Sequence, residues 1–253
     1  MLFQEIQTAV KAYDDRRDIA LFDTKEGAIN FTAKYFLQLA DQAIKTKDLF
    51  SVALSGGNTP KAVYEILASS PYQTQIDWSK VVFFFSDERS VPADHPDSNY
   101  YNALNSGLGS LPIDKKRIFR MEAEQTPEIM AKDYEALIEK TLKGTSFDLV
   151  MLGMGSDGHT ASLFPKTHAL HSNEHNVVAN FVPQLNTWRM TFTFNLINAA
   201  SHIAILAFGQ DKAEMIKAVL TESVDSNQVP AIRVGTPSHK ALWILDKDAA
   251  SSI

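Results

Sequence analysis

The amino-acid sequence predicts an α/β protein built on an open, mostly parallel sheet with helices on both faces. Two observations carry this prediction. Short apolar runs of strand length alternate along the chain with longer segments, such as Lys25–Lys47, whose apolar residues recur at helical spacing. One of the runs, Val81–Phe85, is apolar throughout, as is typical of a strand buried on both faces. We expect one α/β domain over residues 1–253, with ligands at the carboxyl ends of the strands.

The expected elements follow one another in a regular order. Each strand is a short apolar run, and each helix has apolar residues on one face, such as Val63, Ile66 and Leu67. The strands are Leu49–Leu54, Val81–Phe85, Phe147–Leu152, Met190–Phe194, His202–Phe208 and Ala241–Leu245. The helices are Lys25–Lys47, Pro60–Ser69, Ser98–Leu108, Thr126–Lys143 and Lys212–Leu220. The alternation favours parallel strands, because each helix can return the chain to the same edge of the sheet.

Composition excludes several classes of protein. The chain is 45% hydrophobic and 21% charged, as in ordinary globular domains, which excludes disorder, collagen and coiled coil as the overall class. It has no cysteine, which excludes disulfide scaffolds, thiolate zinc sites, iron–sulfur clusters and cysteine nucleophiles. The net charge of −6 argues against a general nucleic-acid binder. An anionic substrate would therefore need a local basic pocket.

Neither the start of the chain nor its most apolar window suggests a targeting or membrane segment. The first 18 residues lack a basic region followed by an apolar core, so we expect no secretory signal. The most apolar long window, Thr191–Gly209, is interrupted by polar residues and is interpreted as strand, turn, strand instead of a membrane span. We expect a cytoplasmic protein with no membrane partner, as a monomer or a small homo-oligomer.

A glycine-rich segment follows the first predicted strand and opens a helix. Its glycines permit close backbone approach, Asn58 or Thr59 could cap the helix, and Pro60 fits the first turn. Exposed N–H groups at a helix N-terminus form an anion site, so we predict phosphate or carboxylate binding. A plain strand-to-helix turn is the alternative, although it would need only one glycine and a cap. The full segment is Ser55-Gly56-Gly57-Asn58-Thr59-Pro60.

A second glycine loop, Gly153–Gly158, formally matches the dinucleotide fingerprint G-x-G-x-x-G. The residues after it are too few for a helix before Pro165, and the next acid, Glu174, precedes the following strand instead of ending it. A nicotinamide or flavin site is therefore disfavoured. What remains is a flexible loop that presents Asp157 and His159 for general acid–base chemistry. A purely structural histidine is the alternative.

Charged residues stand beside three further predicted elements. Asp87-Glu88-Arg89 follows the apolar run Val81–Phe85, and a solvated loop is its alternative interpretation. Arg189 precedes a strand, and Lys212 begins a helix, where a cation is poorly placed for the helix dipole unless an anion binds there. Taken singly, each could be an ordinary surface charge.

Other motifs are weak or absent. His168, His171 and His175 could share a helix face, but imidazole spacing alone is poor evidence for a metal, and we expect none. The sequence has no G-x-S-x-G elbow and no Walker A motif, which disfavours serine hydrolases of the α/β-hydrolase type and common nucleotide triphosphatases.

Together these segments resemble the 6-phosphogluconolactonase family, in the superfamily that also contains glucosamine-6-phosphate deaminase. The segment Thr160–Pro165 is the most specific part, because the deaminases diverge after the histidine. The deaminases also carry an aromatic residue where this chain has Arg89. The matching stretches, which follow the family's order over nearly the whole chain, are Ser55–Pro60, Asp87–Pro92, Asp97–Tyr100, Leu152–Pro165, Arg189 and Gly209–Ala213.

The resemblance implies a fold of the deaminase/ribose-phosphate-isomerase type. It also implies hydrolysis of 6-phosphoglucono-δ-lactone to 6-phosphogluconate, a step of the oxidative pentose phosphate pathway. The partner would be a sugar-phosphate lactone, with no metal or organic cofactor. The family's histidine base corresponds to His159, and its phosphate-binding elements correspond to Ser55–Thr59, Arg189 and Lys212.

The residues suit that chemistry. A lactone is an activated ester, so water needs only a base, and imidazole with an ordinary pKa of about 6.5 serves at physiological pH. We expect Asp157 to assist His159, and Arg89 or N–H groups of the glycine loop to stabilise the oxyanion. Asp87 is expected to contact the substrate.

Two other functions stay open at this point. One is deamination or aldose–ketose isomerisation of a sugar phosphate in the same fold. The other is a non-catalytic sugar-phosphate sensor. A sensor would normally carry a DNA-binding or partner domain, and the predicted elements use nearly all 253 residues, so we expect no such domain.

Overall fold

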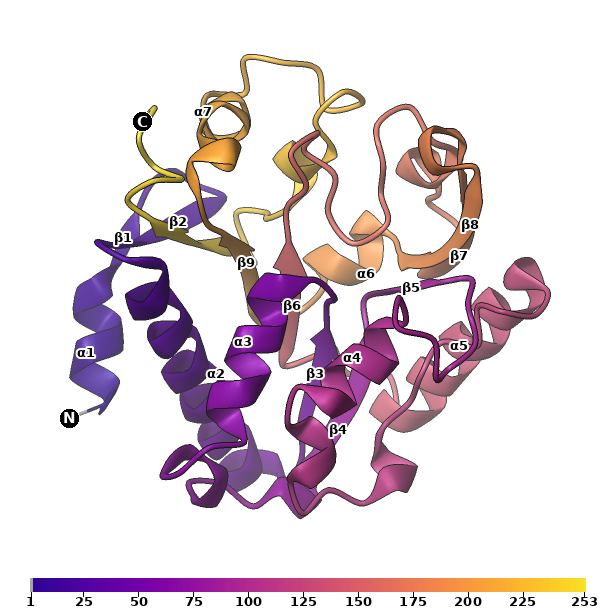
Figure 1. The fold of residues 1–253 in the computed structure, drawn as a ribbon, viewed down its shortest axis with the longest axis horizontal. Coiled ribbons are helices and arrows are strands. Elements are labelled where there is room, and N and C mark those ends of the chain that lie inside the picture. The colour runs from indigo at the N-terminus through magenta and orange to yellow at the C-terminus, as the bar shows by residue number, and fades with distance from the viewer. Residues whose placement is uncertain (1) are drawn as a thin grey trace.

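The computed structural model describes residues 2–253. Its main sheet has seven strands in the order β1-β2-β10-β9-β6-β3-β4 (Figure 1). The β1–β2 pair is antiparallel, and the other neighbouring pairs are parallel. This arrangement confirms the predicted open, mostly parallel α/β sheet. The strand bounds are β1 Val10–Ala12, β2 Arg17–Phe22, β3 Phe50–Leu54, β4 Val81–Phe85, β6 Leu149–Gly153, β9 Ile203–Ala207 and β10 Ala241–Asp246.

Helices cover both faces of this sheet, as predicted. Strand β4 shows the division, because its side chains alternate between two apolar clusters. Val81, Phe83 and Phe85 belong to the cluster that includes buried residues of α1 to α4, whereas Val82 and Phe84 belong to the cluster that includes buried residues of α5 to α7. The helix bounds are α1 Leu2–Ala9, α2 Lys25–Lys47, α3 Asn58–Leu67, α4 Asn99–Asn105, α5 Pro127–Leu142, α6 Phe194–Asn198 and α7 Ala213–Thr221.

Helix α2 has the predicted bounds, whereas α3 begins two residues earlier than predicted. The residue that caps α3 is Gly57, with φ 100°, and it makes no side-chain hydrogen bond. The expectation that Asn58 or Thr59 caps the helix was therefore wrong, since both lie in its first turn. Glycine suits the capping position because a positive φ carries little steric cost without a Cβ.

A small antiparallel sheet, which the sequence did not predict, stands beside the main one (Figure 1). Its order is β5 Asp87–Arg89, β8 Thr187–Phe192 and β7 Val177–Val182. The solvated-loop interpretation of residues 87–89 was wrong, because Asp87 and Glu88 are 6% and 2% exposed. The predicted strand Met190–Phe194 ends two residues early, and α6 occupies the expected turn. Within residues 2–253, no helix is long and apolar enough to cross a membrane.

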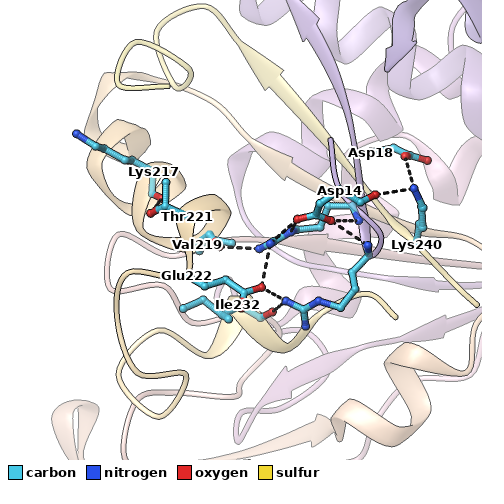
Figure 2. Close-up of polar contacts among 10 residues, drawn as sticks. Asp14, Asp18, Lys217, Val219, Thr221, Glu222, Ile232 and Lys240 are labelled. Atoms are coloured by element: carbon cyan, nitrogen blue, oxygen red, sulfur yellow. Dashed lines mark hydrogen bonds and ion pairs between the residues drawn. The ribbon is translucent and has the colours of Figure 1, made fainter. Parts of the chain in front are cut away.

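The β1–β2 hairpin is joined to the carboxyl end of α7 by a group of charges that we term the amino-terminal ion cluster: Asp14, Arg16, Arg17 and Glu222. Figure 2 labels Asp14 and Glu222 and marks the polar contacts around them. The buried Arg17 guanidinium donates to Asp14 Oδ2 at 2.7 Å and to Glu222 Oε1 at 2.9 Å. It also donates to the Val219 carbonyl at 2.6 Å, in the last turn of α7, where a cation interacts favourably with the negative end of the helix dipole. The cluster therefore fixes α7 against the edge of the main sheet.

Candidate active site

A polar cleft lies at the carboxyl ends of strands β3, β4 and β6, and it has a volume of ≈ 180 Å³. Parallel strands end at the same edge, so the loops that follow them meet there. Six predicted site residues line this cleft: Ser55, Gly56, Gly57, Asp87, Arg89 and His159. Within residues 2–253, its lining does not include Asn58, Thr59, Asp157, Arg189 or Lys212.

His159 is held on three sides. Its Nδ1 lies 2.5 Å from Asp157 Oδ1, and the same oxygen accepts the His159 backbone N–H at 3.1 Å. The imidazole stacks on the Phe164 ring with centroids 4.0 Å apart. A Cβ on Gly155 would lie 2.2 Å from His159 Nδ1, so this glycine is needed for the ring to fit. With Nδ1–H donated to Asp157, Nε2 is the nitrogen available to accept a proton.

Asp157 is suited to orient His159 as an ionised carboxylate. Partial burial alone would raise the pKa of Asp157, but the hydrogen bonds and charge of His159 outweigh it and hold that pKa below the ordinary value. An ionised Asp157 favours the imidazole tautomer with the proton on Nδ1 and stabilises an imidazolium. The structure thus brings together the histidine and the acid that the sequence placed two residues apart.

Asp87 faces the cleft and is held by two neutral donors. Ser162 Oγ donates to Asp87 Oδ2 at 2.7 Å. Asn99 Nδ2 donates to the Asp87 carbonyl at 2.9 Å and to Oδ1 at 3.3 Å. The Asn99 side chain also packs against the glycine segment, where a Cβ on Gly56 would lie 1.7 Å from Asn99 Oδ1. Position 56 therefore requires glycine, because the Asn99 side chain approaches its backbone too closely for any Cβ.

Glu88 was part of a predicted segment, but its role was missed. This carboxylate accepts backbone N–H groups of Arg89, Asn99 and Tyr100 at 2.7–2.9 Å, and the Ser98 hydroxyl at 3.0 Å. Burial raises the pKa of Glu88 despite these donors. Glu88 thus anchors the start of α4, which carries Asn99. No local pattern could reveal this role, because three of the four donors follow ten or more residues later.

Arg89 and Arg189 are opposite each other in the small sheet. Like charges directly opposite on paired strands repel one another, so this pair favours an anion between or beside them. Arg89 donates Nη1 to the Asp97 carbonyl at 2.9 Å. Burial, together with the charge of Arg89, lowers the pKa of Arg189. The buried nitrogens Arg89 Nε, Arg189 Nε and Arg189 Nη1 have no hydrogen-bond partner among the described residues.

The glycine segment presents a second unpartnered group. Ser55 is 4% exposed, and its Oγ lacks a partner in the described part of the chain. Its carbonyl accepts the buried Tyr64 hydroxyl at 2.8 Å, which fixes the loop to α3. Buried polar groups are normally hydrogen-bonded, so an unpartnered hydroxyl beside the N-terminus of α3 is suited to a ligand.

Lys212 lies on the loop after β9, at the end of a short 3₁₀ turn. Its Nζ is 3.1 Å from Asp211 Oδ2. The loop begins at Gly209, whose N–H donates to the buried Asp246 carboxylate at 3.0 Å. Lys212 thus shares the carboxyl edge of the main sheet with the other loops.

The three histidines whose spacing in the sequence is weak evidence for a metal site lie outside the cleft. His168, His171 and His175 are exposed and line a separate hollow of ≈ 420 Å³. His175 Nδ1 is 3.2 Å from Glu135 Oε2. Among residues 2–253, no group of three or more histidine and acidic residues is arranged to hold a metal ion.

The fold and the cleft define an α/β protein with a histidine–aspartate pair and basic side chains at the carboxyl edge of a parallel sheet. The chain belongs to the family described as glucosamine-6-phosphate isomerases/6-phosphogluconolactonase, which matches residues 23–243.

Named relatives extend over most of the chain. A 6-phosphogluconolactonase of Chlamydia trachomatis is 37% identical and covers 93% of this chain and 90% of its own. A probable 6-phosphogluconolactonase 2 of Oryza sativa is 35% identical, with 95% and 92% covered. The solved 6-phosphogluconolactonase of Trypanosoma brucei superposes with a TM-score of 0.81 at 26% identity, covering 93% and 98%. The predicted family is therefore confirmed.

Proposed function

We propose that this protein is a hydrolase that converts 6-phosphoglucono-δ-lactone to 6-phosphogluconate, a step of the oxidative pentose phosphate pathway. The observation that carries the proposal is the His159–Asp157 pair, which opens onto the same small cleft as Arg89 and the Ser55 loop. The names of the 34–37% identical relatives favour lactone hydrolysis over deamination within the family.

In the proposed reaction, His159 Nε2 removes a proton from water while the water oxygen bonds to the lactone carbonyl carbon. Asp157 accepts Nδ1–H and stabilises the resulting imidazolium. The tetrahedral oxyanion is stabilised by Arg89 or by N–H groups of the Gly153–Gly158 loop. The ring C–O bond then breaks, and the leaving alkoxide takes the proton from His159. The product acid ionises to the carboxylate.

The remote phosphate would position the sugar. Its proposed ligands are the Ser55–Thr59 segment at the N-terminus of α3, Arg189 and Lys212. The unpartnered Ser55 Oγ and Arg189 nitrogens support this assignment. Asp87, which lines the cleft as a buried carboxylate, would accept a hydrogen bond from a sugar hydroxyl.

The experiment is to mix the purified protein with freshly prepared lactone and follow its disappearance against the spontaneous rate. We expect lactone loss that scales with protein concentration. Ammonia release from glucosamine 6-phosphate, with no effect on the lactone, would favour a deaminase. Tight binding of 6-phosphogluconate without turnover of either compound would favour a sensor.

A further inference from the structure

Ser162 lies in the loop that carries His159, yet it is buried away from solvent and held by the small sheet. Its N–H donates to Thr191 Oγ1 at 3.1 Å, and its carbonyl accepts Asn180 Nδ2 at 2.9 Å. Ser162 is 2% exposed, and Asn180 and Thr191 are no more exposed than that. The backbone at Ser162 is therefore fixed on both sides by buried side chains of β7 and β8.

The hydroxyl of Ser162 points to the cleft carboxylate. Its 2.7 Å hydrogen bond to Asp87 Oδ2 is short and charge-assisted, which makes it one of the stronger contacts of this region. A carboxylate rotates easily about its terminal torsion, so a firm donor on one oxygen sets the direction of the other. Asn99 supports the same orientation more weakly, at 3.3 Å from Oδ1.

We infer that Ser162 is a positioning residue for the reaction, because it locks the Asp87 carboxylate into the orientation that receives the substrate and ties it to the loop of His159. The inference rests on the proposed lactonase function. His159 and Ser162 belong to one short loop, so a shift of the loop moves the base and the carboxylate together. Misplacement of reacting groups by about 1 Å can lower the rate by as much as 10²-fold. A hydrogen bond that fixes the Asp87 carboxylate relative to His159 therefore favours catalysis.

A merely structural hydroxyl would behave differently. It would satisfy the buried Asp87 and support folding, so its loss would lower the melting temperature while the folded variant kept its kcat/KM and its product affinity. A positioning hydroxyl acts through Asp87, so its loss should matter only while the carboxylate is present.

The chain offers a matched control at the opposite end of the sheet. Ser51 Oγ donates to Asp148 Oδ2 at 2.9 Å, and Ser51 is 0% exposed. The Ser51→Ala variant removes a serine–aspartate hydrogen bond that is part-buried and lies outside the cleft lining. It should lower the melting temperature and leave kcat/KM for the lactone within about twofold of wild type.

The test is a double-mutant cycle of Ser162→Ala and Asp87→Ala, read on kcat/KM for the lactone and on 6-phosphogluconate affinity by calorimetry. We expect Ser162→Ala alone to lower kcat/KM by about tenfold, as for one charge-assisted hydrogen bond, and to weaken product binding. In the Asp87→Ala background both effects should shrink to less than about twofold. Product affinity keeps the cycle measurable even if Asp87→Ala has no detectable turnover.

Equal effects of Ser162→Ala in both backgrounds would overturn the inference and leave the proposed function intact. A wild-type protein that does not accelerate lactone hydrolysis would overturn both. If Ser162→Ala does not fold, Thr191→Val takes its place in the cycle, since it removes the acceptor of the Ser162 N–H. The same dependence on Asp87, at smaller size, is then expected, and its absence would count against the inference.

Discussion

The molecule has two pairs of arginines that differ in their hydrogen-bond partners: Arg16 with Arg17, and Arg89 with Arg189. In the amino-terminal ion cluster, the Arg17 guanidinium is 4% exposed, and its three nitrogens reach a carboxylate or a carbonyl (Figure 2). In the small sheet, Arg189 faces Arg89, and two of its buried nitrogens have no partner within the described residues. Arg17 therefore finds its hydrogen-bond partners within the chain, whereas Arg189 has nitrogens left over for a ligand.

The difference separates folding from binding. Burying a charge without a partner is costly, so a fold keeps such a group only where something else supplies the opposite charge. Arg17 has partners from the chain itself and fixes α7 to the sheet edge. Arg89 and Arg189 are held in place by strand pairing, while Arg89 Nε, Arg189 Nε and Arg189 Nη1 have no partner in the described residues and stay available to an anion. Changes in the first pair should therefore alter stability, and changes around the second should alter catalysis.

The largest effect on the cleft side is expected for His159→Asn. The change keeps the size and one hydrogen-bonding group but removes the base, so kcat should fall by about 10²–10⁴-fold. The melting temperature should change little. Steady-state kinetics provide the check, and a variant with near-wild-type kcat would refute the assignment.

The next largest effect is expected on phosphate binding, where Arg189 should affect substrate recognition and not stability. Arg189→Met or Lys212→Met should raise KM for the phosphorylated lactone by roughly 10–100-fold, as for a lost hydrogen bond to a charged group. The unphosphorylated lactone should be affected much less. The quantity to measure is the ratio of kcat/KM for the two lactones. If that ratio is unchanged in both variants, these residues do not bind the phosphate.

The opposite outcome is expected for Arg17→Met. Removing one partner of a fully buried ion pair costs several kcal/mol, but Asp14 and Glu222 are partly exposed, so we expect a loss of about 1–3 kcal/mol in unfolding free energy. KM should stay within about twofold of wild type. Denaturant unfolding measures the loss. Lys45→Met is the control, because its exposed pair with Asp41 should contribute less than about 0.5 kcal/mol.

The effect of Arg17→Met should depend on pH in a definite direction. Partial burial alone would raise the pKa of Asp14, but its hydrogen bonds to Arg17 and Arg16 and the charge of Arg17 hold that pKa below the ordinary value. A lowered carboxylate pKa contributes stability that is complete above the unfolded-state pKa, about 3.9, and is lost as the pH falls through the folded-state pKa. The gap between wild type and variant should therefore narrow below about pH 4. A gap that is constant down to pH 2 would contradict this origin.

The smallest expected effect is that of metal removal. The lactone carbonyl is already reactive, so His159 and water should suffice without a Lewis acid. Exhaustive chelation with EDTA, followed by assay in metal-free buffer, should leave the protein-dependent rate unchanged. The spontaneous hydrolysis of the lactone must be subtracted. Activity that is lost and then restored by one specific divalent ion would return attention to His168, His171 and His175.

The sequence by itself determined the fold class and most of the cleft. Apolar runs such as Val81–Phe85 fix buried strands through local periodicity, and parallel strands end at one edge whatever their order. The glycines that admit His159 and Asn99 were also visible, because a glycine in a loop indicates where another group can approach closely even when that group is not known.

Tertiary structure alone decided which distant residues complete the site. Asp87–Arg89, which local composition could not separate from a solvated loop, became a buried strand through pairing with β8, about a hundred residues away. Ser162, which donates to Asp87, is likewise distant in sequence, as are Val219 and Glu222, which accept from Arg17. A charged side chain is buried only when a specific partner meets it, and no local pattern records that partner. The roles of Glu88 and Ser162 were missed for this reason.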